Sequence, residues 1–286
     1  MSLSVAIITL NEEANLARTL ESVRWAQEIV IVDSGSTDRT VEIAQGFGAK
    51  VFTQEWLGFG AQKNVALEKC TADWILSLDA DEELSPESQR AIQAVTNSAW
   101  EKESVIPTGG SREARVAVEE PAVSSASAYT LPRRNFFLGR SLRHGGMYPD
   151  AKLRLIRRSL FQSGQARFAD RLVHEDIVYA GAVTQLRGDL LHHAYPTIEG
   201  YVEHQRRYAA LAGEMIHLKE KARSKPHSAA WFAIHTLLNP YVTFIYNYFL
   251  RGGFLDGRPG LIYHAYHSCY ISWKYAKAWQ LSKSAE

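Results

Sequence analysis

Cysteine is scarce in this 286-residue chain, which contains only Cys70 and Cys269. Both lie in segments with a helical pattern and not in a framework of spaced cysteines, so we expect no structural disulfide and a reducing compartment. The amino terminus lacks the basic stretch and the apolar run of a secretory signal, and it enters a strand pattern at once. We therefore expect a cytoplasmic protein.

The chain also lacks an excess of charge of either sign. Its 32 Lys and Arg residues and 31 Asp and Glu residues give a net charge of +1, so nothing indicates binding to nucleic acid. The charge is unevenly placed: residues 199–286 carry eleven basic and six acidic residues, whereas residues 1–198 carry 21 and 25. The hydrophobic fraction of 46% suffices for one sizeable core. We predict a main domain over residues 1–198 and a basic, helical region over 199–286.

The first hundred residues alternate short apolar runs with helical patterns, as parallel βαβ units do. We predict an α/β fold with a Rossmann-like, mostly parallel central sheet flanked by helices. The predicted strands are residues 5–8, 29–32, 50–52 and 74–78, and the predicted helices are residues 15–23, 40–47, 61–69 and a segment that begins near Pro86.

Polar clusters follow three of these strands. They are Thr9-Leu10-Asn11-Glu12, Asp33-Ser34-Gly35-Ser36-Thr37-Asp38 and Asp79-Ala80-Asp81. Any one of them could be an ordinary turn or helix cap. Three on the same edge of a parallel sheet favour a ligand site, because ligands bind beyond the carboxyl ends of such strands.

Asp79 and Asp81 flank a strand end that turns into a loop, where both carboxylates can approach one hard cation. Oxygen-rich sites of this kind suit Mg²⁺ or Mn²⁺ held partly by substrate phosphates. A metal there would neutralise a departing diphosphate. The pattern therefore predicts a metal site that serves a leaving group.

Apolar periodicity fails between residues 96 and 128, which are rich in charged residues, Gly, Pro and Ser. We predict a mobile insertion there. Strand patterns resume at residues 129–131 and at 152–157, where polar and apolar residues alternate.

The three polar clusters, in this order and spacing, resemble the family 2 glycosyltransferases of the GT-A fold. A narrower resemblance is to bacterial enzymes that add glucose to the inner core of lipopolysaccharide. It rests on Gly145-Gly146-Met147-Tyr148-Pro149-Asp150, Leu153-Arg154-Leu155, Arg171-Leu172-Val173-His174-Glu175 and Gly253-Phe254-Leu255-Asp256-Gly257.

The resemblance implies a UDP-sugar donor and assigns roles around it. Asp33 would hydrogen-bond the uracil, and Thr9 and Glu12 would line the nucleoside pocket. Lys63 would meet the diphosphate, although a solvated lysine at a helix start is an equal alternative.

For the metal, the resemblance implies that Asp81 is a ligand and that Asp79 contacts the ribose or a metal-bound water. His192 is a further candidate ligand of the metal or the diphosphate. A buried, hydrogen-bonded histidine is its alternative.

Inverting transfer needs one base to take the proton of the acceptor hydroxyl. The resemblance places this base at Glu175, and Asp176 is the alternative. A structural reading makes Glu175 a salt-bridge partner of Arg171.

Residues 228–250 carry no charge and approach the length of about 20 apolar residues that crosses a bilayer, but His, Asn and Pro interrupt them. Many are aromatic, and basic residues follow. This composition suits helices that lie on the anionic inner face of the cytoplasmic membrane, where a lipid-anchored acceptor could be met. Packing on the main domain or on a second subunit is the alternative.

We therefore predict an inverting, metal-dependent hexosyltransferase that moves glucose to a hydroxyl of a cell-envelope glycan or glycolipid such as lipopolysaccharide core. An aspartate-nucleophile phosphatase also begins with a strand that ends in Asp-x-Asp, but it expects Thr or Val where Glu83 stands. A dinucleotide-dependent dehydrogenase would need a Gly-x-Gly-x-x-Gly after the first strand. A membrane-surface binding module without catalysis is the remaining alternative.

Overall fold

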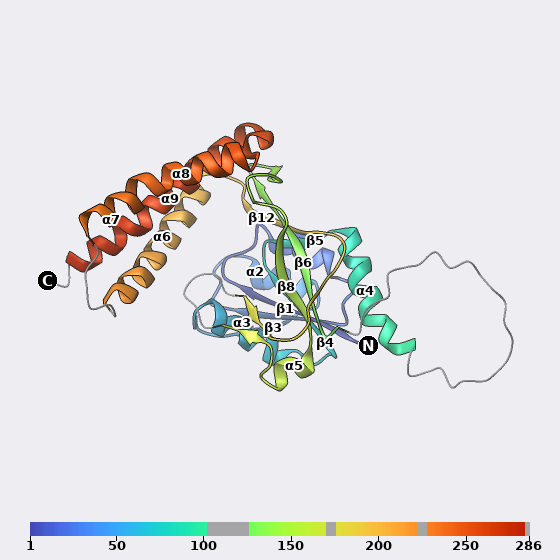
Figure 1. Ribbon diagram of the computed structural model, residues 1–286. Helices are drawn as coiled ribbons and strands as arrows, with labels where there is room; N and C mark the ends of the chain where they lie inside the picture. Colours follow the sequence, from blue (N-terminus) through green and yellow to red (C-terminus); the bar gives the residue numbers. More distant parts are fainter. Residues whose placement is uncertain (102–125, 170–175, 222–227, 284–286) are drawn as a thin grey trace.

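A computed structural model describes residues 1–101, 126–169, 176–221 and 228–283. Figure 1 shows a sheet flanked by helices and an elongated helical arm that leaves the sheet at one end. Within the described residues, ten strands form one sheet, whose main path runs β3-β2-β1-β4-β8-β6-β12-β5.

The amino-terminal half of the sheet is parallel, as predicted. Strand β1 (Leu3–Thr9) pairs with β2 (Glu28–Asp33) on one side and with β4 (Trp74–Asp79) on the other, and β3 (Lys50–Thr53) extends the sheet beyond β2. The crossovers contain α1 (Leu16–Ser22), α2 (Thr40–Gly46) and α3 (Phe59–Lys69).

Alternate residues of β1 pack into two different hydrophobic cores, because successive side chains of a strand point to opposite faces of the sheet. Val5 and Ile7 join the core that contains α1, whereas Ala6 joins the core that contains α3. Burial on both faces explains why β1, β2 and β4 are nearly continuous runs of apolar residues.

The other half of the sheet is mixed. Strand β8 (Asp150–Arg157) runs antiparallel to both β4 and β6 (Ala128–Phe137), and β12 (Leu190–Tyr195) runs parallel to β6. Strand β5 (Glu82–Leu84) closes this edge antiparallel to β12.

Several short elements complete this part of the chain. Strands β7 (Arg140–Ser141) and β11 (Thr184–Gln185) both pair with β6. Helix α5 (Arg158–Gln162) follows β8, and β9 (Arg167–Phe168) and β10 (Ile177–Val178) form a separate two-stranded sheet.

The predicted insertion at residues 96–128 is partly wrong at its start. Helix α4 (Pro86–Glu101) continues five residues past Thr96, and Thr96 is buried with its hydroxyl donating to the carbonyl of Ile92. Residues 102–125 lie outside the described residues, so the insertion itself stays a prediction.

The arm begins after β12. Helix α6 (Ile198–Lys221) lies along α9 (Gly257–Lys283), and the two meet closely at Gly213, where an added Cβ would lie 2.9 Å from the carbonyl oxygen of Lys274. Between them, α7 (Ala229–Ala233), η1 (Ile234–Leu238), α8 (Asn239–Ile245) and η2 (Tyr246–Leu250) follow one another, and η3 (Gly253–Asp256) leads into α9.

A small aromatic core fixes the base of the arm to the sheet. Phe137 from β6, Leu142, Tyr201 from α6 and Tyr263 from α9 are buried together. None of the described helices has the length and apolar character required to cross a bilayer. The division at residues 198 and 199 stays a prediction about domains.

Candidate active site

The loop after β2 is organised around the Asp33 carboxylate, which is 2% exposed. One carboxylate oxygen accepts hydrogen bonds from the hydroxyls of Thr9 (2.8 Å) and Ser36 (2.5 Å), and the other accepts from the backbone N–H groups of Gly35 (2.9 Å) and Ser36 (2.8 Å). Burial alone would raise the pKa of Asp33, but these hydrogen bonds outweigh it and lower the pKa. A uracil N–H would have to replace one of these four donors.

Glu12 lies at the start of the loop after β1, where it is half-buried. Burial raises its pKa, the hydrogen bond from Asn15 (3.1 Å) opposes this, and the charges of Asp81, Asp38 and Asp79 add to the rise. The polar ends of β1, β2 and β4 therefore share one electrostatic environment that favours a cation.

Asp79 is held between two cationic side chains. Its Oδ1 lies 2.7 Å from the Lys63 Nζ, and its Oδ2 lies 2.8 Å from an Arg154 guanidinium nitrogen. Burial alone would raise the pKa of Asp79, but Lys63 and Arg154 lower it strongly. Lys63 is 5% exposed, so the alternative of a solvated lysine at a helix start is wrong.

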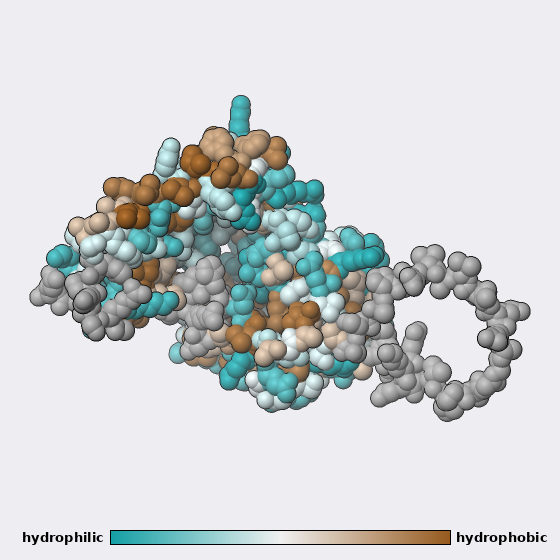
Figure 2. All heavy atoms as spheres, viewed as in Figure 1, coloured by the Kyte–Doolittle hydropathy of each residue, from teal (hydrophilic) through white to brown (hydrophobic). Residues whose placement is uncertain are grey.

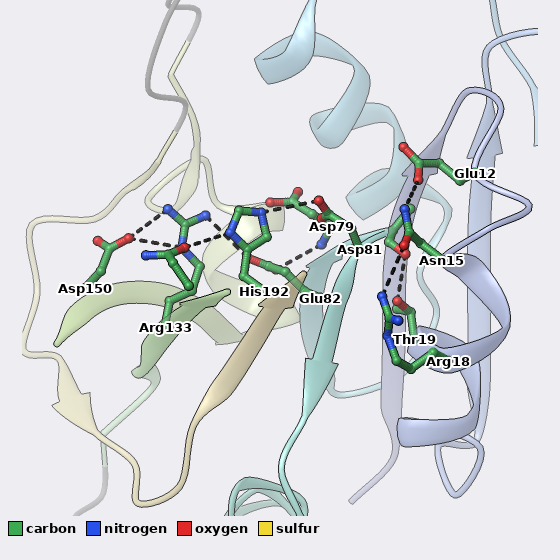
Figure 3. Close-up of polar contacts among 12 residues, drawn as sticks. Glu12, Asn15, Arg18, Thr19, Asp79, Asp81, Glu82, Arg133, Asp150 and His192 are labelled. Atoms are coloured by element: carbon green, nitrogen blue, oxygen red, sulfur yellow. Dashed lines mark hydrogen bonds and ion pairs between the residues drawn. The ribbon is translucent and has the colours of Figure 1, made fainter. Parts of the chain in front are cut away.

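Arg154 also joins Asp79 to a second buried carboxylate. Its guanidinium lies 2.6 Å from Glu82, which is fully buried, and Arg133 lies 3.6 Å from the same carboxylate oxygen. Arg133 in turn binds Asp150 at 2.7 Å. This chain of alternating charges fixes the segment around Asp79 to β6 and β8. Figure 3 shows four of its members, Asp79, Glu82, Arg133 and Asp150.

Asp81 faces His192 of β12 (Figure 3). Asp81 Oδ2 lies 3.3 Å from His192 Nε2, and His192 Nδ1 lies 2.7 Å from the side-chain oxygen of Asn135. Burial alone would raise the pKa of Asp81, but His192 lowers it. A neutral His192 with its proton on Nδ1, toward the Asn135 oxygen, would have Nε2 available as a metal ligand on the Asp81 side.

The Asp81 and His192 pair fits a divalent cation that also takes ligands from a diphosphate. One oxygen of the Asp81 carboxylate and the Nε2 atom of His192 lie close together. Both side chains are partly exposed, Asp81 at 23% and His192 at 13%. No group of three such residues is placed to hold a metal among the described residues. The remaining ligands would then be phosphate oxygens and water, as is usual for Mg²⁺. Asp79 is less suited, because it already binds two cations.

Helix α6 of the arm borders this pair. The His204 ring lies 5.2 Å from the Tyr195 ring and stacks on Tyr208 at 4.1 Å, measured between centroids. Burial lowers the pKa of His204 to about 4, although the Asp81 charge acts in the opposite direction. The arm therefore places a neutral imidazole beside the site.

The predicted base Glu175 lies outside the described residues, as does Arg171. Asp176 is described: its side chain is 54% exposed, and its carboxylate lies 3.5 Å from the Lys152 Nζ. Asp176 also contributes to raising the pKa of Arg154. The alternative base therefore lies on the same side of the sheet as the charged chain.

Sequence reasoning did not assign Arg154, Glu82, Arg133 or Asn135 to the site. The sequence does contain a pattern that concerns Arg154. Lys152 and Arg154 alternate with apolar residues, so their side chains share one face of a strand. A charged face of a strand is ordinarily solvated, and nothing in the pattern marks Arg154 as 3% exposed.

Comparison with known proteins places this arrangement in a family. The model of the family described as "Glycosyl transferase family 2" matches residues 4–164, which contain β1 to β4 and the acidic residues at their ends. The chain belongs to glycosyl transferase family 2. Membership in this family decides against the aspartate-nucleophile phosphatase and the dehydrogenase.

Two relatives from this group of transferases show how far the similarity extends. The lipopolysaccharide core biosynthesis glycosyltransferase LpsC of Rhizobium meliloti is 28% identical over 277 residues, which are 92% of this chain and 89% of LpsC. An uncharacterized glycosyltransferase of Rickettsia typhi, RT0209, is 49% identical over 94 residues. That match spans 32% of this chain and 32% of the Rickettsia protein.

A solved structure confirms the fold of this family 2 chain. The mannosyltransferase PcManGT from Pyrobaculum calidifontis, solved in complex with GDP-Man and Mn²⁺, superposes with a TM-score of 0.50 at 14% sequence identity. The alignment covers 97% of this chain and 86% of PcManGT. The predicted GT-A fold, with a mixed central sheet and an aromatic-rich helical region at the carboxyl terminus, is confirmed.

Proposed function

We propose that this transferase moves a hexose, glucose in our reading, from a UDP-sugar to a hydroxyl of a cell-envelope glycan or glycolipid, with lipopolysaccharide core as the acceptor class. The alignment to LpsC over 92% of the chain supports the acceptor class. The single observation that carries the chemistry is the Asp81 and His192 pair, 3.3 Å apart, at the carboxyl end of β4.

We assign the metal, Mg²⁺ or Mn²⁺, to Asp81 and His192. When bound, the ion would neutralise charge on the departing diphosphate. Asn135 fixes the His192 ring through the 2.7 Å hydrogen bond, and outer partners of this kind tune metal affinity.

We assign Asp79 to the ribose or to a water on the metal, and Lys63 to the diphosphate. Lys63 and Arg154 hold the Asp79 carboxylate ionised and in place. The Lys63 ammonium lies 2.7 Å from Asp79 at the carboxyl end of β4, which is where we place the diphosphate. Both assignments depend on the donor entering at the edge where β1, β2 and β4 end.

The nucleoside would lie over the loops after β1 and β2. Thr9 is 3% exposed and bonded to Asp33, so we propose that it shapes the floor of the pocket through Asp33. Glu12 is the more accessible of the two and would contact the nucleoside from the side. Asp33 would bind the uracil N–H only if Ser36 releases one of its hydrogen bonds.

We propose that Glu175 is the base, with Asp176 as the alternative. The carboxylate takes the proton of the acceptor hydroxyl, the hydroxyl oxygen bonds to the anomeric carbon, and the bond from that carbon to the diphosphate breaks with inversion. UDP leaves with the electron pair of the broken bond. The Asp176 carboxylate lies 3.5 Å from the Lys152 Nζ, so it already has an ion-pair partner.

Two measurements test this proposal. Calorimetry with a panel of nucleotide sugars and Mn²⁺ or Mg²⁺ identifies the donor, and release of UDP in the presence of extracted core glycolipids tests transfer. Glu175→Gln should abolish transfer and leave UDP–metal binding intact, whereas the matched variant Asp176→Asn should keep transfer. The reverse pattern would assign the base to Asp176. Metal-dependent donor binding with no transfer to any glycan acceptor would favour a binding module.

A further inference from the structure

The arm carries a stripe of large apolar side chains that remain largely exposed. The run from α7 to η2 is a continuous helical path over residues 229–250. Its exposed large apolar side chains recur at helical spacing: Ile234, Leu237, Leu238, Tyr241, Val242, Tyr246, Phe249 and Leu250. Leu237 is 72% exposed and Leu250 is 75% exposed, and a run of such side chains along one helix marks an interaction surface.

The opposite face of the same run is the one that packs on α9. Trp231 meets Tyr275 with ring centroids 5.5 Å apart, and Phe232 meets Trp279 at 5.8 Å. The stripe is therefore a second apolar face on a helix that is already anchored. Figure 2 shows hydrophobic side chains gathered along the outer side of the arm.

The stripe ends at a tip where apolar and basic side chains alternate. In η3, Phe254 is 48% exposed and Leu255 is 55% exposed. Arg251 precedes them, Arg258 follows them, and both are exposed. Arg140, also exposed, lies beside this tip, because its guanidinium would be 3.6 Å from a Cβ added at Gly257.

The segment that carries the stripe and the tip has almost no acidic residues. Residues 228–283 contain five Lys or Arg residues and one acidic residue, Asp256. Asp256 is 3% exposed, and its carboxylate accepts hydrogen bonds from the backbone N–H groups of Arg143 and His144 and lies 2.8 Å from the His144 ring nitrogen. The exposed Arg251 and Arg258 therefore have no exposed carboxylate near them within the described residues 228–283.

We infer that the stripe and the tip dock on the surface of an anionic phospholipid bilayer. The leucines and aromatics would enter the interface between headgroups and acyl chains, and the arginines would meet lipid phosphates. A second copy of the chain fits less well. A two-fold contact through this face would pair like surfaces and bring the arginines no opposite charge. The inference is independent of which sugar or acceptor the site uses.

Co-sedimentation of the full-length protein with vesicles tests this inference. The protein should sediment with phosphatidylcholine vesicles that contain about 30% phosphatidylglycerol and remain in the supernatant with pure phosphatidylcholine. Leu237→Gln/Leu250→Gln should weaken binding by at least about tenfold. The matched control Leu218→Gln, on α6 and 55% exposed, should bind as the unmodified protein does.

A charge variant separates electrostatics from apolar contact. Arg140→Gln/Arg258→Gln should weaken binding to the anionic vesicles by roughly 25-fold, at about fivefold for each arginine. Circular dichroism and the thermal midpoint verify that each variant is folded. Failure of the unmodified protein to sediment, or unchanged binding by both double variants, would overturn the inference. A dimer in sedimentation equilibrium that Leu237→Gln/Leu250→Gln dissociates, without lipid binding, would assign the stripe to a second copy.

Discussion

Replacing Arg154 with Met removes the cation that joins two buried carboxylates. Arg154 is 3% exposed and lies 2.8 Å from Asp79 and 2.6 Å from the fully buried Glu82. Asp79 would retain Lys63 as a cationic partner, but the only cation left near Glu82 among the described residues would be Arg133, at 3.6 Å. Removing one partner of a buried pair leaves an uncompensated charge, so we expect the free energy of unfolding to fall by about 3–5 kcal/mol at pH 7.

The pH dependence of this loss follows from the direction of the Asp79 pKa. In the folded protein, Lys63 and Arg154 lower that pKa, so ionised Asp79 stabilises the fold above the unfolded pKa of about 4, and this contribution is lost as the pH falls. Arg154→Met weakens the lowering. The difference between the two proteins should therefore be greatest near pH 7 and should shrink below about pH 4, where protonated carboxyl groups need no cation.

Urea unfolding at several pH values measures this difference, and two further variants control it. Arg206→Met removes an exposed partner of Glu203 and should leave stability nearly unchanged. Glu82→Gln/Arg154→Met should regain part of the lost stability, because both charges are then absent. A loss below about 1 kcal/mol at pH 7, or a loss that does not depend on pH, would refute the reasoning.

Three further substitutions test other parts of the structure. Asn135→Ala should lower Mn²⁺ affinity by about 10- to 100-fold in calorimetry, because His192 loses its orienting partner; unchanged affinity would remove His192 from the metal site. Gly145→Ala should lower the thermal midpoint, since φ is +65° and the new Cβ would lie 2.1 Å from a ring nitrogen of His264; a midpoint equal to that of the unmodified protein would refute this packing. Glu28→Gln should lower the free energy of unfolding by about 1–2 kcal/mol at pH 7, because hydrogen bonds to a charged acceptor are lost. The ion pair of Glu28 with its exposed lysine partner adds little to this value. That cost should vanish as the pH falls through the folded pKa of about 2, and a cost that persists there would contradict it.

The parallel half of the sheet could be predicted from the sequence because its information is local. Each of β1 to β4 is an apolar run bounded by turn residues, and a helical pattern separates each from the next. The mixed half depends on pairing between distant segments. Strand β5 is three residues long, and its partner β12 begins far along the chain at Leu190. No local sequence pattern therefore predicts that these two strands pair.

The candidate site was predictable where a residue type matched a strand end. Asp81 lies beside His192, and the Asp79 charge is near enough to raise the pKa of Asp81. The burial of Lys63 could not be read from its place at a helix start, because it depends on the Asp79 carboxylate from another element. Arg154 was likewise hidden, since an arginine in an alternating strand usually faces water.

Metal-dependent release of UDP tests the central claim most directly. The unmodified protein, given a UDP-sugar, extracted core glycolipid and Mn²⁺, should release UDP, and chelation of the metal should stop the release. Asp81→Asn should reduce the rate by at least about a hundredfold, while its unfolding free energy stays close to that of the unmodified protein. UDP release that persists in Asp81→Asn, or that does not require a metal, would contradict the assignment of Asp81 and His192 as the metal site.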